Sequence, residues 1–170
     1  MQFGTGRMSS VAAIAVVGVV GVLGAVEAFA ATPSSKEDPW VERGRYVVFI
    51  GGCNDCHTPG FAENGGKAKE ADLLTGSSLG WHGPWGTTYP VNLRLYFQTI
   101  TEKEWLTGAK KFTGRPPMPF WAINHMGKGD LRAVYRYIHS LGPSGHPAPE
   151  FVPPGQEPKT PVVQFPMPPR

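Results

Sequence analysis

The segment Cys53-Asn54-Asp55-Cys56-His57 concentrates the reactive side chains of this chain, and its two cysteines are the only ones in 170 residues. Cysteines three positions apart on one helical turn place both thiols on the same side, with the imidazole next in line. Such a group can do thiol redox chemistry, bind a metal ion, or hold a prosthetic group through both sulfur atoms.

Three uses of this segment agree less well with the rest of the sequence. A thioredoxin-like redox pair needs a βαβ context, which the glycine-rich residues after His57 do not provide. A zinc site needs further close ligands, and there is no third cysteine. A disulfide between Cys53 and Cys56 fits the spacing but gives His57 no role. The CxxCH spacing instead matches covalent attachment of a c-type haem, with one thiol on each vinyl group and His57 on the iron.

A haem that only carries electrons has both axial positions of its iron filled. We predict Met118 as the second ligand, because the prolines at 116, 117 and 119 restrict the backbone that presents it. An isolated methionine is more often a packing residue, and we interpret Met126 in this way; Met167 is a third candidate. Four histidines, interpreted as surface or loop residues, are alternatives in principle: His82, His125, His139 and His146.

Two helices are expected to cross and to support this site. Asp38 followed by Pro39 is a helix-start signal, and a helix over about 39–50 is predicted, with the apolar stripe Trp40, Gly44, Val47, Val48 and Gly51. A second helix is predicted from after Asp130 to Gly142, with the stripe Leu131, Val134, Tyr135, Ile138 and Leu141. The glycine in the middle of the first stripe lets the second helix approach its backbone.

The remaining residues predict one more helix and much irregular chain. Thr101 and Glu104 form a capping-box signature, and the buried side of this helix comes from Trp105, Leu106 and Ala109. Residues 58–98 show no sustained period, so we expect them to pack on a ligand instead of forming a sheet. The 22 glycines and 18 prolines of the chain favour loops and extended segments. Residues 143–170 are predicted to be extended, over the surface or free in solvent.

The first thirty residues are interpreted as an export signal. Residues 11–26 are apolar residues and glycine, and Ala28-Phe29-Ala30 is a small-x-small site for cleavage before Ala31. The alternative is an uncleaved membrane anchor, because the apolar stretch is nearly long enough to cross a bilayer. We therefore expect a periplasmic protein with a signal at 1–30, one domain at 31–142 and a proline-rich tail at 143–170.

Composition excludes several classes of protein. The 16 Lys and Arg against 13 Asp and Glu give a formal net charge of +3, too small and too scattered for nucleic-acid binding. With 17% charged and 41% apolar residues, the chain is neither a charge-rich disordered protein nor a multi-span membrane protein.

The order of these motifs resembles the class I c-type cytochromes. It is most similar to the haem modules in the cytochrome c subunits of bacterial periplasmic dehydrogenases for alcohols and sugar acids, over the stretches 53–59, 85–93, 116–121 and 130–141. The resemblance implies a mainly α fold of three to five short helices and long loops around one covalent haem. It also implies axial ligation by His57 and Met118, with Trp85, Tyr89 and Asn92 near the haem and able to hydrogen-bond its propionates.

The resemblance does not carry over a partner, because those subunits hold three haem modules and this chain has one CxxCH. We predict an electron carrier rather than an enzyme, with a periplasmic dehydrogenase, an oxidase or a membrane complex as redox partner. The alternatives are a haem-based gas sensor or small-ligand enzyme with an open sixth position, and an anchored haem subunit. The basic residues near the Met118 loop form either a docking face for an acidic partner or a merely solvated face: Lys103, Lys110, Lys111, Arg115 and Lys128.

Overall fold

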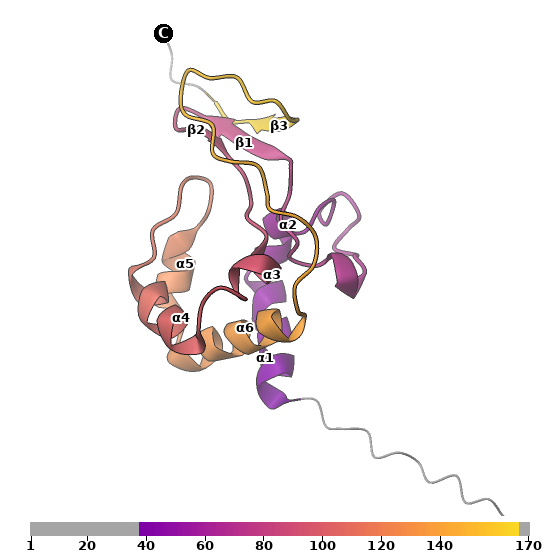
Figure 1. The fold of residues 1–170 in the computed structure, drawn as a ribbon, viewed down its shortest axis with the longest axis vertical. Helices are drawn as coiled ribbons and strands as arrows, with labels where there is room; N and C mark the ends of the chain where they lie inside the picture. Colours follow the sequence, from indigo (N-terminus) through magenta and orange to yellow (C-terminus); the bar gives the residue numbers. More distant parts are fainter. Residues whose placement is uncertain (1–37, 167–170) are drawn as a thin grey trace, which may run out of the picture. The chain divides into compact units, whose positions relative to one another are not determined.

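The computed structural model describes residues 38–166, so the predicted export signal and Met167 lie outside the described residues. The helices are α1 (Pro39–Ile50), α2 (Cys53–His57), α3 (Leu93–Tyr96), α4 (Glu102–Gly108), α5 (Phe120–His125) and α6 (Lys128–Ser140) (Figure 1). The strands are β1 (Gly80–Gly83), β2 (Gly86–Thr88) and β3 (Val162–Gln164), and two short 3-10 helices are η1 (Glu70–Asp72) and η2 (Ala109–Lys111). Within residues 38–166, no helix has the length and apolar character needed to cross a bilayer.

Helix α1 begins where its start signal predicts. The carboxylate of Asp38 accepts a hydrogen bond from the backbone N–H of Trp40 at 2.9 Å. Pro39 occupies the first helical position, where an N–H would have no partner within the helix. The predicted helix over residues 39–50 is therefore confirmed.

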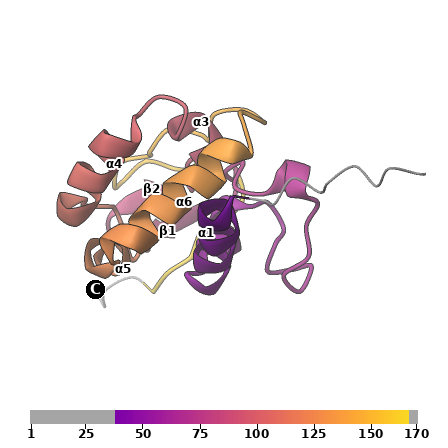
Figure 2. The ribbon, with the colours of Figure 1, turned by 90° about the horizontal axis from the view of Figure 1, so that it is seen from below.

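Helices α1 and α6 cross at Gly44, and this contact lies at the centre of the core (Figure 2). A Cβ at position 44 would overlap the backbone oxygen of Ala133 and lie 2.5 Å from the Cβ of Tyr137. Only a residue without a side chain allows so close an approach, so the predicted crossing is confirmed. The buried cluster around it consists of Val47, Val48, Leu74, Phe97, Trp105, Ala109, Leu131, Val134, Tyr137 and Ile138.

Helix α4 has the predicted capping box and packs on α6. The hydroxyl of Thr101 accepts from the backbone N–H of Glu104 at 3.2 Å, and the Glu104 carboxylate accepts from the backbone N–H of Thr101 at 2.7 Å. Trp105 is buried, and its indole N–H donates to the carbonyl of Leu131 at 2.7 Å. The buried side of α4 is thus attached to α6 by packing and by one buried hydrogen bond.

Glu102 adds an ionic connection between α4 and α6. Its carboxylate binds the guanidinium groups of Arg132 at 2.7 Å and Arg136 at 3.2 Å. Burial raises the pKa of Glu102, but the two guanidinium groups outweigh it and hold the pKa below its ordinary value. Arg136 also lies 3.5 Å from Asp38, the cap of α1. These groups are partly exposed, so each pair contributes about 0.2–1 kcal/mol.

A small sheet occurs where the sequence predicted loop. Strands β1 and β2 form an antiparallel hairpin with Trp81 opposite Thr88, and β3 pairs in parallel with β1, with Gly80 opposite Val162. The expectation that residues 58–98 pack without forming a sheet is therefore wrong. Strands of three or four residues are too short to show a period-2 pattern, and β3 comes from the far end of the chain. In its described part, residues 143–166, the tail is largely extended and lies over the surface (Figure 1).

Gly44→Ala is expected to lower the free energy of unfolding by about 1–3 kcal/mol, because the added methyl group must push α6 away from α1. Urea unfolding followed by circular dichroism measures this change. Gly108→Ala is the matched control, since a Cβ at position 108 meets no atom within 4 Å. It should leave stability unchanged or raise it by up to about 1 kcal/mol. An equal loss in both variants would contradict the role given to the crossing.

Candidate functional site

A tight turn after α1 leads directly into the helix that carries both thiols and the imidazole. Gly52, the N-cap of α2, has φ of 66°, a left-handed conformation that disfavours a side chain. Helix α2 then spans five residues and includes Cys53, Cys56 and His57. Both cysteines are free and partly buried. The predicted grouping of these three side chains on one helical turn is therefore observed.

The surroundings of the thiols do not favour thiol redox or zinc chemistry. Burial raises the pKa of Cys53 from its ordinary value to about 11, and burial also raises the pKa of Cys56. Both groups are therefore thiols at neutral pH, whereas a redox-active cysteine needs a lowered pKa. Across residues 38–166, no group of three or more His, Cys, Asp and Glu side chains is arranged to hold a metal ion.

His57 is buried and oriented by one hydrogen bond. Its Nδ1 lies 2.8 Å from the backbone oxygen of Val91, which can only accept, so Nδ1 carries the proton. The lone pair of the imidazole is then on Nε2, and within the described residues no hydrogen bond engages that atom. Burial lowers the pKa of His57 and outweighs the opposite effect of the Val91 bond, so the imidazole is neutral at pH 7. A neutral imidazole with its other nitrogen bonded to a carbonyl is the usual form of a metal-ligating histidine.

Two buried polar residues hold α2 against the following loop. The hydroxyl of Thr58 donates to the side-chain oxygen of Asn54 and accepts from the backbone N–H of Leu74, both at 2.8 Å. The carbonyl of His57 accepts from the N–H of Gly76, also at 2.8 Å. Sequence analysis did not single out Asn54 or Thr58. Their signal is weak, since buried and exposed Asn and Thr look alike in sequence.

The two described methionines differ in their surroundings. Met126 packs against the apolar core, and its Cε lies 3.8 Å from the position that a Cβ of Gly51 would occupy. The structure thus confirms Met126 as a packing residue. Met118 is partly buried and is not part of that cluster. Its Cγ lies 3.3 Å from the position that a Cβ of Gly114 would occupy. The backbone N–H of Met118 donates to the carbonyl of Arg115 at 3.1 Å, which closes the turn that presents its side chain.

Two buried polar atoms have no hydrogen-bond partner in the described part of the chain. They are Nε1 of Trp85 and the hydroxyl oxygen of Thr88. The Trp85 ring packs edge-on against Phe165, with 5.1 Å between ring centroids. A buried indole N–H without an acceptor is costly, so this position fits a bound acceptor such as a carboxylate.

Tyr89 and Asn92 have partners within the chain. The hydroxyl of Tyr89 accepts from the hydroxyl of Thr160 at 2.9 Å. The side chain of Asn92 accepts from the N–H of Leu95, as the cap of α3, and donates to the carbonyls of Ser144 and His146. Both residues flank Val91, the partner of His57. That they lie beside a haem remains a prediction.

Arg94 is a buried residue that sequence analysis did not assign. Its guanidinium group donates to the carbonyls of Ala71 (2.9 Å), Leu141 and Gly142 (2.7 Å). It thereby joins α3 to the end of α6 and to η1. An arginine in the otherwise apolar run 93–97 was the available signal, because such a group must be buried with partners.

Several of the other candidate ligands and cations have partners within the chain. The ring of His82 contacts the hydroxyl of Thr87, that of His125 contacts the carbonyl of Trp121, and that of His139 stacks on Tyr135. The carbonyl of His146 accepts a hydrogen bond from Asn92. Among the basic residues near Met118, Lys110 donates to the carbonyls of Asn124 and Met126. The guanidinium of Arg115 lies 4.0 Å from the ring centroid of Phe151.

Comparison with known proteins supports the resemblance that the motifs predict. The chain is 31% identical to the gluconate 2-dehydrogenase cytochrome c subunit of Pantoea cypripedii over 66% of its length, and 25% identical to the fructose dehydrogenase cytochrome subunit of Gluconobacter japonicus over 70%. It is 30% identical to a nicotinate dehydrogenase subunit of Pseudomonas putida over 64% of its length. The predicted resemblance to cytochrome subunits of bacterial dehydrogenases is thus confirmed.

The matches cover only part of each relative. The chain spans 29% of the gluconate 2-dehydrogenase subunit, 25% of the fructose dehydrogenase subunit and 9% of the nicotinate dehydrogenase subunit. No family model matches the chain. No solved structure matches it either.

Thr58→Val is expected to lower the free energy of unfolding by about 1–3 kcal/mol, because the buried N–H of Leu74 and the side chain of Asn54 lose their partner. Urea titration measures it. The control is Thr107→Val, which removes an exposed hydroxyl bonded to the carbonyl of Lys103 and should cost less than about 0.5 kcal/mol. If Thr58→Val costs no more than Thr107→Val, the Thr58 bonds do not hold α2 in place.

Proposed function

We propose that this chain, which resembles the cytochrome subunits of bacterial dehydrogenases, is a monohaem c-type cytochrome with the mainly α class I fold. The observation that carries the proposal is the arrangement on α2. Two free thiols and a buried imidazole share one helical turn, and the imidazole has its proton on Nδ1 and its lone pair on Nε2. Covalent haem attachment is the chemistry that uses all three groups.

The residues present fit a haem. Cys53 and Cys56 would form the two thioethers, and Nε2 of His57 would ligate the iron. The unpartnered Trp85 Nε1 and Thr88 hydroxyl are suited to donate to the propionate carboxylates. When bound, the haem supplies a reversible one-electron iron couple.

Tyr89 and Asn92 belong to the same proposed haem surroundings, in a supporting role. They flank Val91, and Asn92 also caps α3 and holds the start of the tail through Ser144. Their hydrogen bonds hold the backbone around Val91 in place. The carbonyl of Val91 accepts a hydrogen bond from the Nδ1–H of His57. This bond holds the imidazole in one tautomer and one orientation, which raises its basicity as a ligand.

Met118 is the proposed second axial ligand. Its side chain lies outside the apolar core, whereas that of Met126 is used in packing. A thioether ligand favours the ferrous state and raises the reduction potential. With both axial positions filled, the protein would be an electron carrier and no substrate would meet the iron.

The proposed setting is the periplasm, where the carrier exchanges electrons with a dehydrogenase, an oxidase or a membrane complex. The names of the relatives make a dehydrogenase the best-supported partner. The basic residues around the Met118 loop would attract an acidic partner before docking. Membrane association through the N-terminal segment is the alternative to a freely diffusing protein.

The visible spectrum of the purified protein tests this function. We expect a low-spin haem c whose ferrous form binds carbon monoxide only slowly, because His57 and Met118 occupy both axial positions. In Cys53→Ser/Cys56→Ser the haem should become extractable by acid and organic solvent. Rapid carbon monoxide binding by the wild type would instead support the gas-sensor or small-ligand enzyme alternative. A wild-type protein without haem would instead indicate that Cys53 and Cys56 act as thiols.

Met118→Ala should abolish the charge-transfer band from methionine to ferric iron and lower the reduction potential by roughly 100 mV or more. The matched control, Met126→Ala, should reduce stability by about 1–3 kcal/mol, since this side chain is partly buried, but keep the band. Redox titration and absorption spectroscopy measure both effects. The opposite pattern would move the axial ligand to Met126.

A further inference from the structure

The proline-rich tail is attached at its start by buried side chains. Arg94 donates to the carbonyls of Leu141 and Gly142, where α6 ends. Asn92 donates to the carbonyls of Ser144 and His146 at 2.8 and 3.1 Å. The tail therefore leaves α6 in a set direction, towards the β1–β2 hairpin (Figure 1).

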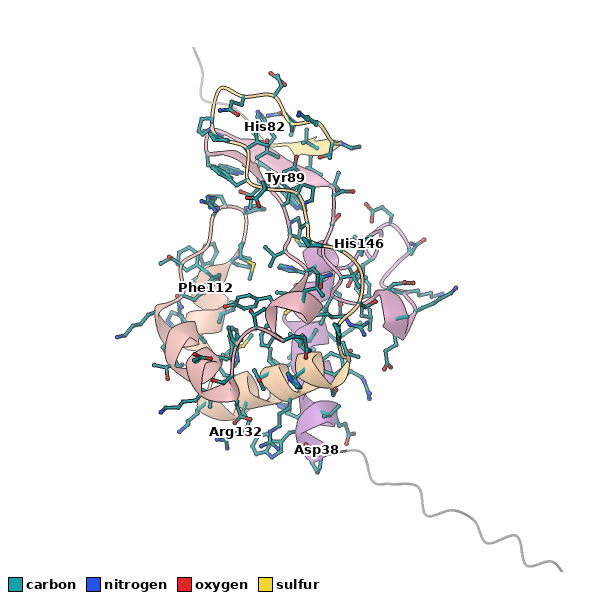
Figure 3. The ribbon with its side chains drawn as sticks, viewed as in Figure 1. Asp38, His82, Tyr89, Phe112, Arg132 and His146 are labelled. Atoms are coloured by element: carbon teal, nitrogen blue, oxygen red, sulfur yellow. The ribbon has the colours of Figure 1, made fainter. Side chains whose placement is uncertain are left out.

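The far end of the tail is attached to that hairpin. Strand β3 pairs with β1, and the N–H of Phe165 donates to the carbonyl of His82 at 2.8 Å. The ring of Phe165 packs on Trp81 and Trp85, at 5.9 and 5.1 Å between centroids. Tyr89 is labelled in Figure 3 where the tail passes the hairpin, and its hydroxyl accepts a hydrogen bond from the hydroxyl of Thr160.

The middle of the tail touches both the hairpin and the Met118 loop. Val152 and Thr87 exchange two backbone hydrogen bonds, at 2.7 and 3.0 Å. The backbones are so close that a Cβ on Gly86 would overlap the carbonyl oxygen of Val152. The neighbouring residue, Phe151, lies under the guanidinium of Arg115 at 4.0 Å, a cation–π contact.

The Met118 loop, residues 113–119, makes few hydrogen bonds. Every hydrogen bond that residues 113–119 make within the described part of the chain is local, joining positions between 115 and 122. Arg115 lies three residues before Met118, and its carbonyl accepts the N–H of Met118 at 3.1 Å. The Arg115–Phe151 contact therefore connects the turn that presents Met118 to a segment far away in the sequence.

We propose that the tail is a strap over the Met118 loop, in which Phe151 and Arg115 are positioning residues for the thioether of Met118. The Val152–Thr87 pairing holds Phe151 in place, and Phe151 holds the guanidinium of Arg115. The turn closed by the hydrogen bond from Met118 N–H to the Arg115 carbonyl then restricts the thioether of Met118 to a narrow range of positions. This inference rests on the proposed ligation of the iron by Met118.

The test is the rate of carbon monoxide binding to the ferrous holoprotein of Phe151→Leu. Carbon monoxide enters only when Met118 leaves the iron, so loosening the loop should raise the rate by about two- to fivefold, the factor expected for the loss of an exposed cation–π contact, and weaken the ferric charge-transfer band. Phe151→Tyr keeps the aromatic ring and should behave as the wild type. Arg115→Gln, which keeps a polar side chain but removes the cation, should match Phe151→Leu.

Hydrogen exchange gives a second measurement that does not depend on the iron. In Phe151→Leu, peptides covering residues 112–119 should take up deuterium faster, while peptides from α1 and α6 stay unchanged. The control is Lys159→Ala, a tail residue whose exposed side chain makes no hydrogen bond, ion pair or ring contact in the described structure. Lys159→Ala should change neither the rate of carbon monoxide binding nor the hydrogen exchange of residues 112–119.

The outcomes separate this inference from the proposed function. A wild type without the methionine band overturns both. A wild type with the band, together with unchanged rates and exchange in Phe151→Leu and Arg115→Gln, overturns the strap alone. Equal loosening by Lys159→Ala, or uniform loss of protection across α1 and α6, would also overturn it, because the effect would then be general destabilisation.

Discussion

The structure depends on the close approach of α1 and α6 at Gly44. Any side chain at this position would occupy the space of the Ala133 backbone and the Cβ of Tyr137. The approach buries apolar side chains of both helices. The end of α1 leads through Gly52 into α2, and the end of α6 leads into the tail held by Arg94.

The candidate site is built from backbone groups as much as from side chains. The carbonyl of Val91 determines which nitrogen of His57 is free, and the amide of Leu74 determines where Thr58 can lie. Both lie in irregular segments between α2 and α4: Leu74 lies between η1 and β1, and Val91 lies between β2 and α3. In irregular segments, carbonyls and amides can form hydrogen bonds with side chains, whereas in a regular helix or sheet they bond to one another. These irregular segments are thus a framework for the imidazole.

The tail completes this framework from the opposite end of the sequence. It supplies the third strand of the sheet, a hydroxyl for Tyr89 and a ring for Arg115. Its prolines keep it extended and leave few backbone donors to satisfy. The backbone donors of Val152 and Phe165 pair with the hairpin. A segment without a core of its own is therefore ordered by edge pairing and ring contacts.

The sequence by itself determined those features that depend on neighbouring residues. The bounds of α1, the capping box at Thr101, the grouping of Cys53, Cys56 and His57, and the packing role of Met126 could be predicted, because caps, periodicity and motif spacing are local. The short strands could not be predicted, since three or four residues carry no readable pattern.

Only the tertiary structure decided the long-range contacts. The bond from His57 to Val91, the buried carbonyl partners of Arg94 and the stacking of Arg115 on Phe151 each join residues distant in sequence. No local propensity encodes a hydrogen bond between distant residues, because its partner is set by how the whole chain packs. The reactive groups are therefore readable in the sequence, and their orientation is a property of the fold.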